Sequence, residues 1–102
     1  MLLQNFHAGA TTNETTATFL RDGVNWGYQS SIAGTGAVSA TVTIQGSNDG
    51  SNWTTIGTAM SLSGTGSDIK ATSSSVVWRH HRSVITSITG TGAAVTCIGV
   101  GV

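Results

Sequence analysis

Apolar and polar residues alternate along much of this 102-residue chain, and a period of two is that of β-strands. The clearest case is the segment 37–45, in which every second residue is apolar: Val38, Ala40, Val42 and Ile44. The segments 56–62 and 96–102 alternate in the same way. Each of the three segments therefore predicts a strand with one buried side, and helix has little support.

Turn-forming residues separate the β-rich segments. Asp22-Gly23 is a dipeptide favoured in two-residue turns, so the flanking segments 16–21 and 24–28 are predicted to form a hairpin. A longer β-rich run covers 76–88 and is predicted to end at the glycines of 89–92.

The triplet Gly-Thr-Gly occurs at 34–36, 64–66 and 90–92, and each copy is predicted to be a turn. Turn signals then recur about every ten residues, a spacing typical of β-sandwiches and barrels. The pattern predicts an all-β fold, a single-domain antiparallel β-sandwich that is jelly-roll-like, over residues 16–102. Residues 1–15 are predicted to be an N-terminal arm or a first edge segment.

Composition narrows the possible partners. Only 8% of the residues are charged and the formal net charge is zero, so the polar surface must be mostly Ser, Thr, Asn and Gly. A neutral chain has no electrostatic attraction to nucleic acid or to an anionic membrane, and neither is expected as a partner. The single Cys97 lies in an apolar run and is expected to be a buried, inert thiol. The first ten residues lack the features of a signal peptide, so synthesis in the cytoplasm is expected.

The segment 44–57, IQGSNDGSNWTTIG, has the composition of either a calcium loop or a turn. A calcium loop of the EF-hand type needs several carboxylates and a bidentate Glu at its end, whereas Asp49 is the only carboxylate here. Asn and Asp bond their own backbone and Gly accepts a positive φ, which favours a turn. We therefore predict a hairpin turn without metal or cofactor, built from Asn48, Asp49, Gly50, Asn52 and Trp53.

The run Arg79-His80-His81-Arg82 is the other candidate site. On a strand His80 and His81 point to opposite faces, so they cannot bind one metal ion together. The spacing places no nucleophile or acid beside an orienting group, and the chain is not expected to be an enzyme. Two interpretations stay open for the run: a strand with partly buried polar side chains, or a subunit seam where Arg79 and Arg82 meet acidic residues of a neighbour.

Two motifs resemble those of known families. GSNDGSNWTTI, at 46–56, resembles a hairpin of discoidin-type (coagulation-factor C-type) sandwich domains. From Val38 to Val102 the chain is similar to small β-sandwich proteins encoded beside phage capsid and tail genes. Their shared pattern is matched here by ATVTIQGSNDGSNW and TGTGAAVT, and their Trp-Arg-Tyr-x-Arg strand is replaced by WRHHR.

The second resemblance implies a structural virion protein, most simply a capsid decoration (cement) protein that bridges and stabilises neighbouring shell subunits. It would be made in the host cytoplasm and be located in the virion. No strand partner is evident for the apolar N-terminal residues, which suit an arm, and deleting residues 1–10 is expected to weaken attachment without unfolding the domain. Contacts with the shell or a neighbouring subunit are expected at Leu2, Leu3, Phe6, Arg79 and Arg82.

The sequence is also compatible with other functions. The discoidin likeness implies a carbohydrate-binding module that would hold a glycan with Asn48, Asn52 and an exposed tryptophan, and a third possibility is a tail or head-to-tail adaptor protein. The tryptophans are expected to pack in the core or in turns: Trp26, Trp53 and Trp78. The expected partners are the major capsid protein or other virion proteins, and further copies of the chain in a homo-oligomer, a trimer or a dimer.

Overall fold

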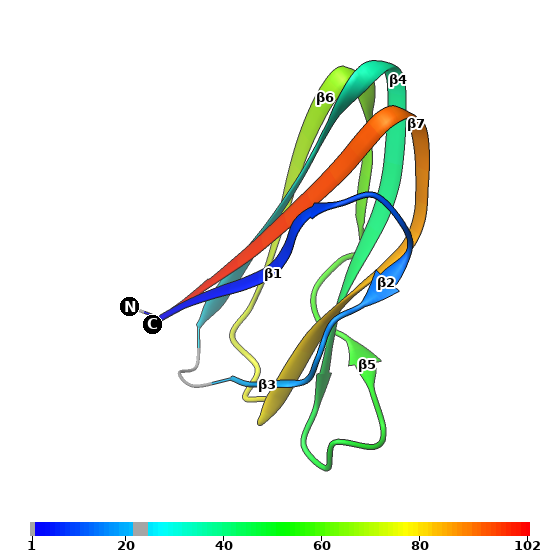
Figure 1. The fold of residues 1–102 in the computed structure, drawn as a ribbon. Helices are drawn as coiled ribbons and strands as arrows, with labels where there is room; N and C mark the ends of the chain where they lie inside the picture. Colours follow the sequence, from blue (N-terminus) through cyan, green and yellow to red (C-terminus); the bar gives the residue numbers. More distant parts are fainter. Residues whose placement is uncertain (1, 22–24) are drawn as a thin grey trace.

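Seven strands pair into one antiparallel sheet, which confirms the expectation of an all-β antiparallel fold (Figure 1). The computed structural model describes residues 2–21 and 25–102, and these two ranges contain no helix. The strands are β1 (Leu2–Ala10), β2 (Glu14–Thr15), β3 (Phe19–Leu20), β4 (Trp26–Ser47), β5 (Thr54–Thr55), β6 (Met60–Ser74) and β7 (His80–Gly101).

The two 22-residue strands β4 and β7 form the centre of the sheet. They pair along their whole length, from Trp26 opposite Gly101 to Ser47 opposite His80. β6 pairs with the other side of β4, while β1, β2 and β3 pair with the other side of β7. The long strands bend midway, so the sheet curls into a half-barrel with two facing limbs (Figure 1).

Both ends of the chain lie on one of these limbs (Figure 1). We call it the terminal limb. It consists of β1 together with residues 26–33 of β4, 67–74 of β6 and 95–101 of β7, which pair side by side. The remaining parts of the long strands, with β2, β3 and β5, form the loop limb.

The three Gly-Thr-Gly triplets lie at the bend between the limbs. Thr35 pairs with Thr91 and Ala37 pairs with Thr65, so the triplets of β4, β6 and β7 are neighbours across the sheet. The pairing register shifts on β4 between Ala33 and Ser39. The prediction that each triplet is a turn separating two strands is therefore wrong, because the strands continue through the glycines and only change direction there.

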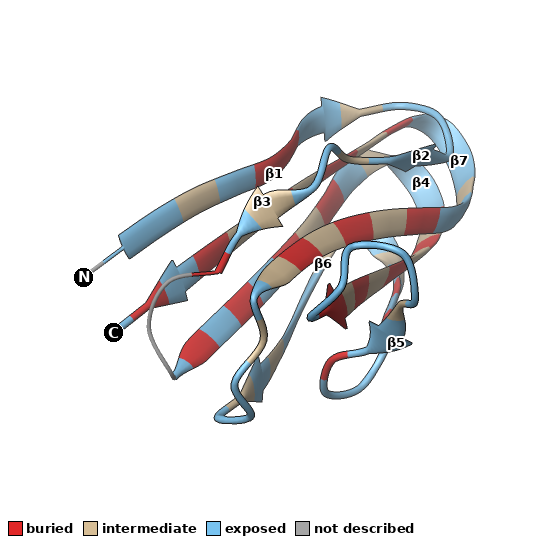
Figure 2. Cartoon of the chain, turned by 90° about the horizontal axis from the view of Figure 1, so that it is seen from below, coloured by how far each residue is buried: buried red, intermediate tan, exposed pale blue. Residues whose placement is uncertain are grey.

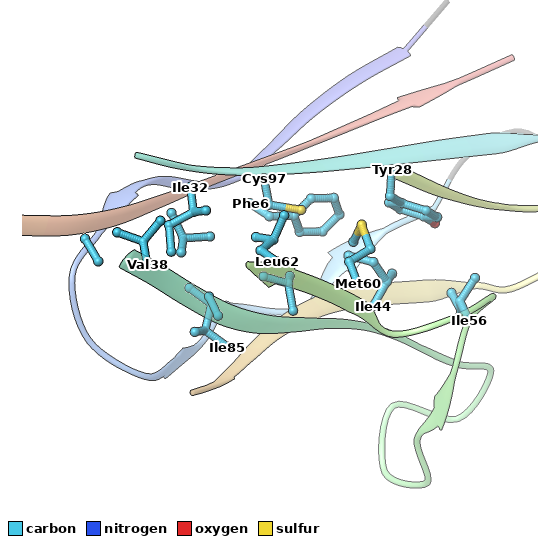
Figure 3. Packing of buried hydrophobic residues seen from close by; sticks show 14 of the residues in the cluster. Phe6, Tyr28, Ile32, Val38, Ile44, Ile56, Met60, Leu62, Ile85 and Cys97 are labelled. Atoms are coloured by element: carbon cyan, nitrogen blue, oxygen red, sulfur yellow. The ribbon is translucent and has the colours of Figure 1, made fainter. Parts of the chain in front are cut away.

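The core fills the space between the limbs (Figure 3). The inward face predicted for 37–45 is confirmed, since its four apolar side chains are at most 3% exposed. Figure 2 shows the same alternation of buried and exposed residues along the long strands. Cys97 is buried as predicted, and burial raises the pKa of its thiol. The buried apolar residues are Phe6, Trp26, Tyr28, Ile32, Val38, Ala40, Val42, Ile44, Ile56, Met60, Leu62, Ile85, Ala93, Val95 and Cys97.

One predicted pairing and one predicted strand boundary differ from the observed ones. The segments 16–21 and 24–28 do not pair with each other, because β3 pairs with the start of β7 while β4 pairs with β5, β6 and β7. The predicted turn at Asp22-Gly23 lies outside the described residues. The run 76–88 is also not a separate strand, since β7 begins at His80 and continues to Gly101.

The N-terminal residues form the edge strand of the terminal limb. Leu2 pairs with Gly101 and Leu3 with Val100, so the idea that these apolar residues have no strand partner is wrong. Their partner is the C-terminal strand, which no local pattern could identify. Phe6 is only 8% exposed and packs against Tyr28, which removes it from the expected contact residues. Leu2 and Leu3 stay exposed.

Candidate functional site

The loop at 48–53, which connects β4 to β5, is organised around the Asp49 carboxylate. Its Oδ1 accepts hydrogen bonds from Ser47 Oγ at 2.9 Å and from the backbone N–H groups of Ser51 and Asn52 at 2.8 Å. Its Oδ2 accepts one from Asn52 Nδ2 at 2.8 Å. The two bonds from Asn52, with those from Ser51 and Ser47, lower the pKa of Asp49. The carboxylate thus holds the loop in one shape.

Further contacts attach this loop to the start of β7. Asn48 Oδ1 accepts a hydrogen bond from the backbone N–H of Arg79 at 2.8 Å. Gly50 has a φ of 77°, which a glycine adopts without strain. Because the Asp49 oxygens are engaged within the loop, the arrangement is that of a preformed turn. Among residues 2–21 and 25–102 there is no group of three or more His, Cys, Asp or Glu that could hold a metal ion.

Trp53 and Arg82 form a stacked pair beside the loop. The Arg82 guanidinium carbon lies 4.0 Å from the centroid of the Trp53 ring, and Arg82 Nε donates a hydrogen bond to Gln45 Oε1 at 2.8 Å. Trp53 and Arg82 are both half-buried, whereas Arg79 is exposed. The guanidinium covers one face of the indole, so a ligand could stack only on the opposite face.

A buried polar network surrounds His81. The His81 ring is 0% exposed, and its centroid lies 4.7 Å from that of Trp26 and 5.0 Å from that of Phe6. Arg21 Nε donates to the Tyr28 hydroxyl at 3.0 Å, and this hydroxyl lies 3.1 Å from His81 Nδ1. Desolvation first, and then the Arg21 charge, lower the pKa of His81 to about 4. His81 is therefore neutral at pH 7, and its Nδ1 accepts a hydrogen bond from the Tyr28 hydroxyl, whose oxygen already accepts one from Arg21.

The Arg21 guanidinium ties three parts of the chain together. It donates to the carbonyl oxygens of Val76 at 2.7 Å and Ser74 at 3.1 Å as well as to Tyr28. It therefore fixes the connection from β6 to β7 against β4. The sequence predicts Arg21 at the end of a hairpin strand, beside the Asp22-Gly23 turn, and this local pattern does not indicate such a role.

His7 forms a second polar contact that the sequence did not indicate. Its Nδ1 lies 2.6 Å from Glu14 Oε1 and its Nε2 lies 2.8 Å from Ser83 Oγ. The register of β1 shifts between Asn5 and His7, so the neighbours Phe6 and His7 are both buried. A bulge of this kind breaks the period of two, which is the signal that sequence reasoning used.

The outer face of the terminal limb carries no ionisable side chain among the described residues that form it. These residues are all Gly, Ser, Thr, Asn, Gln or aliphatic, and the charged residues of the limb, Asp68 and Lys70, lie on the other face of β6. Leu3 is 64% exposed, and Val100, its partner on β7, is also exposed. The face consists of Leu3, Asn5, Gly27, Gln29, Ser31, Ile69, Ala71, Ser73, Thr96, Ile98 and Val100.

A shallow open groove of about 570 Å³ crosses this face. Gly27 lies between its pairing partners Val100 and Ser73, and a Cβ atom built on it would meet nothing within 4 Å. The groove therefore exists because the centre of the face lacks a side chain. Ile98 and Ala71 line it further.

The sequence-predicted residues do not form one site. Asn48, Asp49, Gly50, Asn52, Trp53, Arg79 and Arg82 gather at the tip of the loop limb, Leu2 and Leu3 lie on the terminal limb, and Phe6 is in the core. Comparison with family models, curated proteins and solved structures finds no match to this chain. Within the described ranges no helix has the length and apolarity to cross a membrane.

Proposed function

We propose that this chain is a structural virion protein, a capsid decoration or cement protein that binds neighbouring shell subunits through the outer face of its terminal limb. The observation that carries the proposal is the uncharged outer face with its exposed aliphatic side chains and central groove. The resemblance of residues 38–102 to proteins encoded beside phage capsid genes supports the virion location.

An uncharged face suits binding to the repeated subunits of a shell. Covering it removes no ion from water, and each Å² of apolar area covered contributes about 25 cal/mol. The cores of protein interfaces are likewise depleted of charged residues. On a shell, many weak contacts add up because a bound copy meets the next contact at high effective concentration.

In this proposed function the curled sheet is a jelly-roll-like β-sandwich, and the two limbs are its layers. The partners are the major capsid protein or other virion proteins, and further copies of the chain. The protein acts without catalysis or a cofactor, and is located in the virion after synthesis in the host cytoplasm.

The test places a charge in the centre of the face. Gly27→Glu fits the backbone because Gly27 has an ordinary φ and open space at its Cβ position. We expect the variant to fold normally and to bind purified particles of the encoding phage at least ten-fold more weakly, about 1.4 kcal/mol. Occupancy is measured by co-sedimentation. Ser61→Glu is the matched control, because Ser61 is exposed on the loop limb.

Equal binding of wild type and Gly27→Glu would show that the outer face is not the contact. Absence of wild-type binding to any particle would overturn the virion assignment itself. A second candidate function is glycan binding, favoured by the half-buried Trp53 at the loop. In that case wild type is retained on a glycan column and Trp53→Ala is not, while Gly27→Glu behaves as wild type.

A further inference from the structure

The sheet has two long edges, and they differ in how far they are protected against pairing with another chain. On the β1 edge the register shifts twice, between Asn5 and His7 and between His7 and Ala10. Such bulges twist an edge and oppose the addition of another strand. On the terminal limb β6 pairs with β4 without any shift, from Ser67 to Ser74. β6 therefore presents the edge with the unbroken register.

Only part of this β6 edge is free. Thr72 Oγ1 accepts a hydrogen bond from the backbone N–H of Thr58 at 2.9 Å, and the Ser74 carbonyl accepts one from Arg21. At the other end the strand bends at the Gly-Thr-Gly triplet 64–66. Between these limits lies the five-residue segment Ser67–Ala71. β4 is the only described strand that pairs with it.

The side chains of this segment are arranged so that the segment is complementary to itself. Asp68 and Lys70, two residues apart, share one face of β6, and the Lys70 Nζ lies 3.3 Å from Asp68 Oδ2. The same oxygen accepts a hydrogen bond from the Ser63 backbone N–H at 2.9 Å, and Lys70 is the only lysine of the chain. Ile69 lies between them on the opposite face and is 56% exposed. In an antiparallel pair of two such segments centred on Ile69, each Asp68 faces the Lys70 of the other copy. Ile69 then faces Ile69, and Ser67 faces Ala71.

We propose that Ser67–Ala71 is a docking edge for the same segment of a second copy of this chain, paired antiparallel about a two-fold axis at Ile69. The axis at Ile69 matches the charges, and it also pairs the whole segment Ser67–Ala71. The two observations are independent of each other. Pairing would extend the terminal limb into one sheet across both copies and would make their uncharged outer faces continuous. It implies a dimer rather than a trimer. The proposal does not depend on the proposed function.

Cysteine cross-linking tests both the edge and the register. With the axis at Ile69, the two thiols of an Ile69→Cys dimer face each other, at the Cβ separation of about 4.5–5.5 Å typical of directly opposed residues. In the matched variant Ala71→Cys the two thiols are four strand positions apart, about 13 Å, which is too far for a disulfide. Both sites are exposed on the same face, and the native Cys97 is buried. Under mild oxidation we expect a covalent dimer of Ile69→Cys to form at least ten-fold faster than one of Ala71→Cys.

Equal rates for the two variants, a faster rate for Ala71→Cys, or no dimer from either would each overturn the proposal. A second measurement uses no cysteine. Lys70→Asp places a carboxylate opposite the Asp68 of the other copy on both sides of the axis, and sedimentation should show at least a ten-fold weaker dimer. Asn5→Asp, on the β1 edge, should leave the dimer unchanged. The reverse result would assign the interface to β1.

Discussion

At the scale of single residues, His81 couples folding to pH. Its ring is fully buried among aromatic rings, its Nδ1 is hydrogen-bonded to the Tyr28 hydroxyl, and its Nε2 has no hydrogen-bond partner among residues 2–21 and 25–102. A proton added at His81 would place a second cation near the buried Arg21 guanidinium. The folded protein therefore resists protonation of this imidazole down to a pH of about 4.

The expected consequence is a loss of stability between pH 6.5 and 4. In the unfolded chain the imidazole takes up a proton near its ordinary pKa of about 6.5, whereas in the folded chain it does so only near 4, so falling pH favours unfolding in this window. The contribution of His81 is fully present above pH 6.5, and on the order of 2–3 kcal/mol of it is lost by pH 4. Urea unfolding at several pH values measures this.

His81→Gln provides the control, since glutamine can bond Tyr28 but does not titrate. Its stability should depend less on pH between 4 and 6.5 than that of wild type. An equally steep loss in both proteins would assign the effect to other groups.

At the scale of elements, the glycine triplets mark the level at which the three long strands bend and the sheet curls. Because they lie side by side at one level of the sheet, the strands bend together and keep their pairing on either side. Gly90 is the most constrained of the triplet in β7. Its φ is 118°, and a Cβ atom there would lie 2.7 Å from the Ala37 carbonyl oxygen. Gly92, with a φ of 65°, has open space around it.

The two glycines should therefore respond differently to the same change. Gly92→Ala adds only the cost of a left-handed backbone, about 1–2 kcal/mol. Gly90→Ala adds a clash with the neighbouring strand and should lower the free energy of unfolding by roughly 3 kcal/mol or more. Equilibrium unfolding in urea measures both. Equal losses would mean that the bend between the limbs adjusts to the added methyl group and does not depend on the close approach at Gly90.

At the scale of the whole molecule, the chain closes on itself by pairing its two ends. β1 lies beside the C-terminal half of β7, and Phe6 from β1 enters the core next to Tyr28 and His81. The N-terminal segment is thus part of the folding unit, which changes the expected effect of deleting it.

A chain without residues 1–10 should lose cooperative unfolding, because the deletion removes both the Phe6 ring and the His7 contacts from the interior. Phe6→Ala alone should cost about 3–5 kcal/mol of stability. The exposed Leu3→Ala should change it by no more than about 0.5 kcal/mol. Thermal unfolding followed by circular dichroism compares the three. A deletion variant that unfolds as cooperatively as wild type would restore the idea of a dispensable arm.

Features that depend on near neighbours along the chain could be predicted from the sequence. The period of two from Val38 to Ile44 identified an inward strand face, because successive side chains of a strand point to opposite sides. The residues 48–53 indicated a turn, because Asn, Asp and Gly carry the bonds and backbone freedom of a turn within a few positions. The apolar neighbours of Cys97 likewise indicated a buried thiol.

Only the tertiary structure decided which strands pair, and these pairings determine the surface of each limb. The partner of Leu3 lies at the opposite end of the chain. The glycine triplets form one bend only because the pairing of three strands places them side by side. The burial of His81, the uncharged outer face and the free segment of β6 follow from the same pairings. Their physical reason is that hydrogen bonds between strands join residues far apart in sequence, and these pairings are selected by the burial of the whole core, whereas alternation and turn chemistry are local.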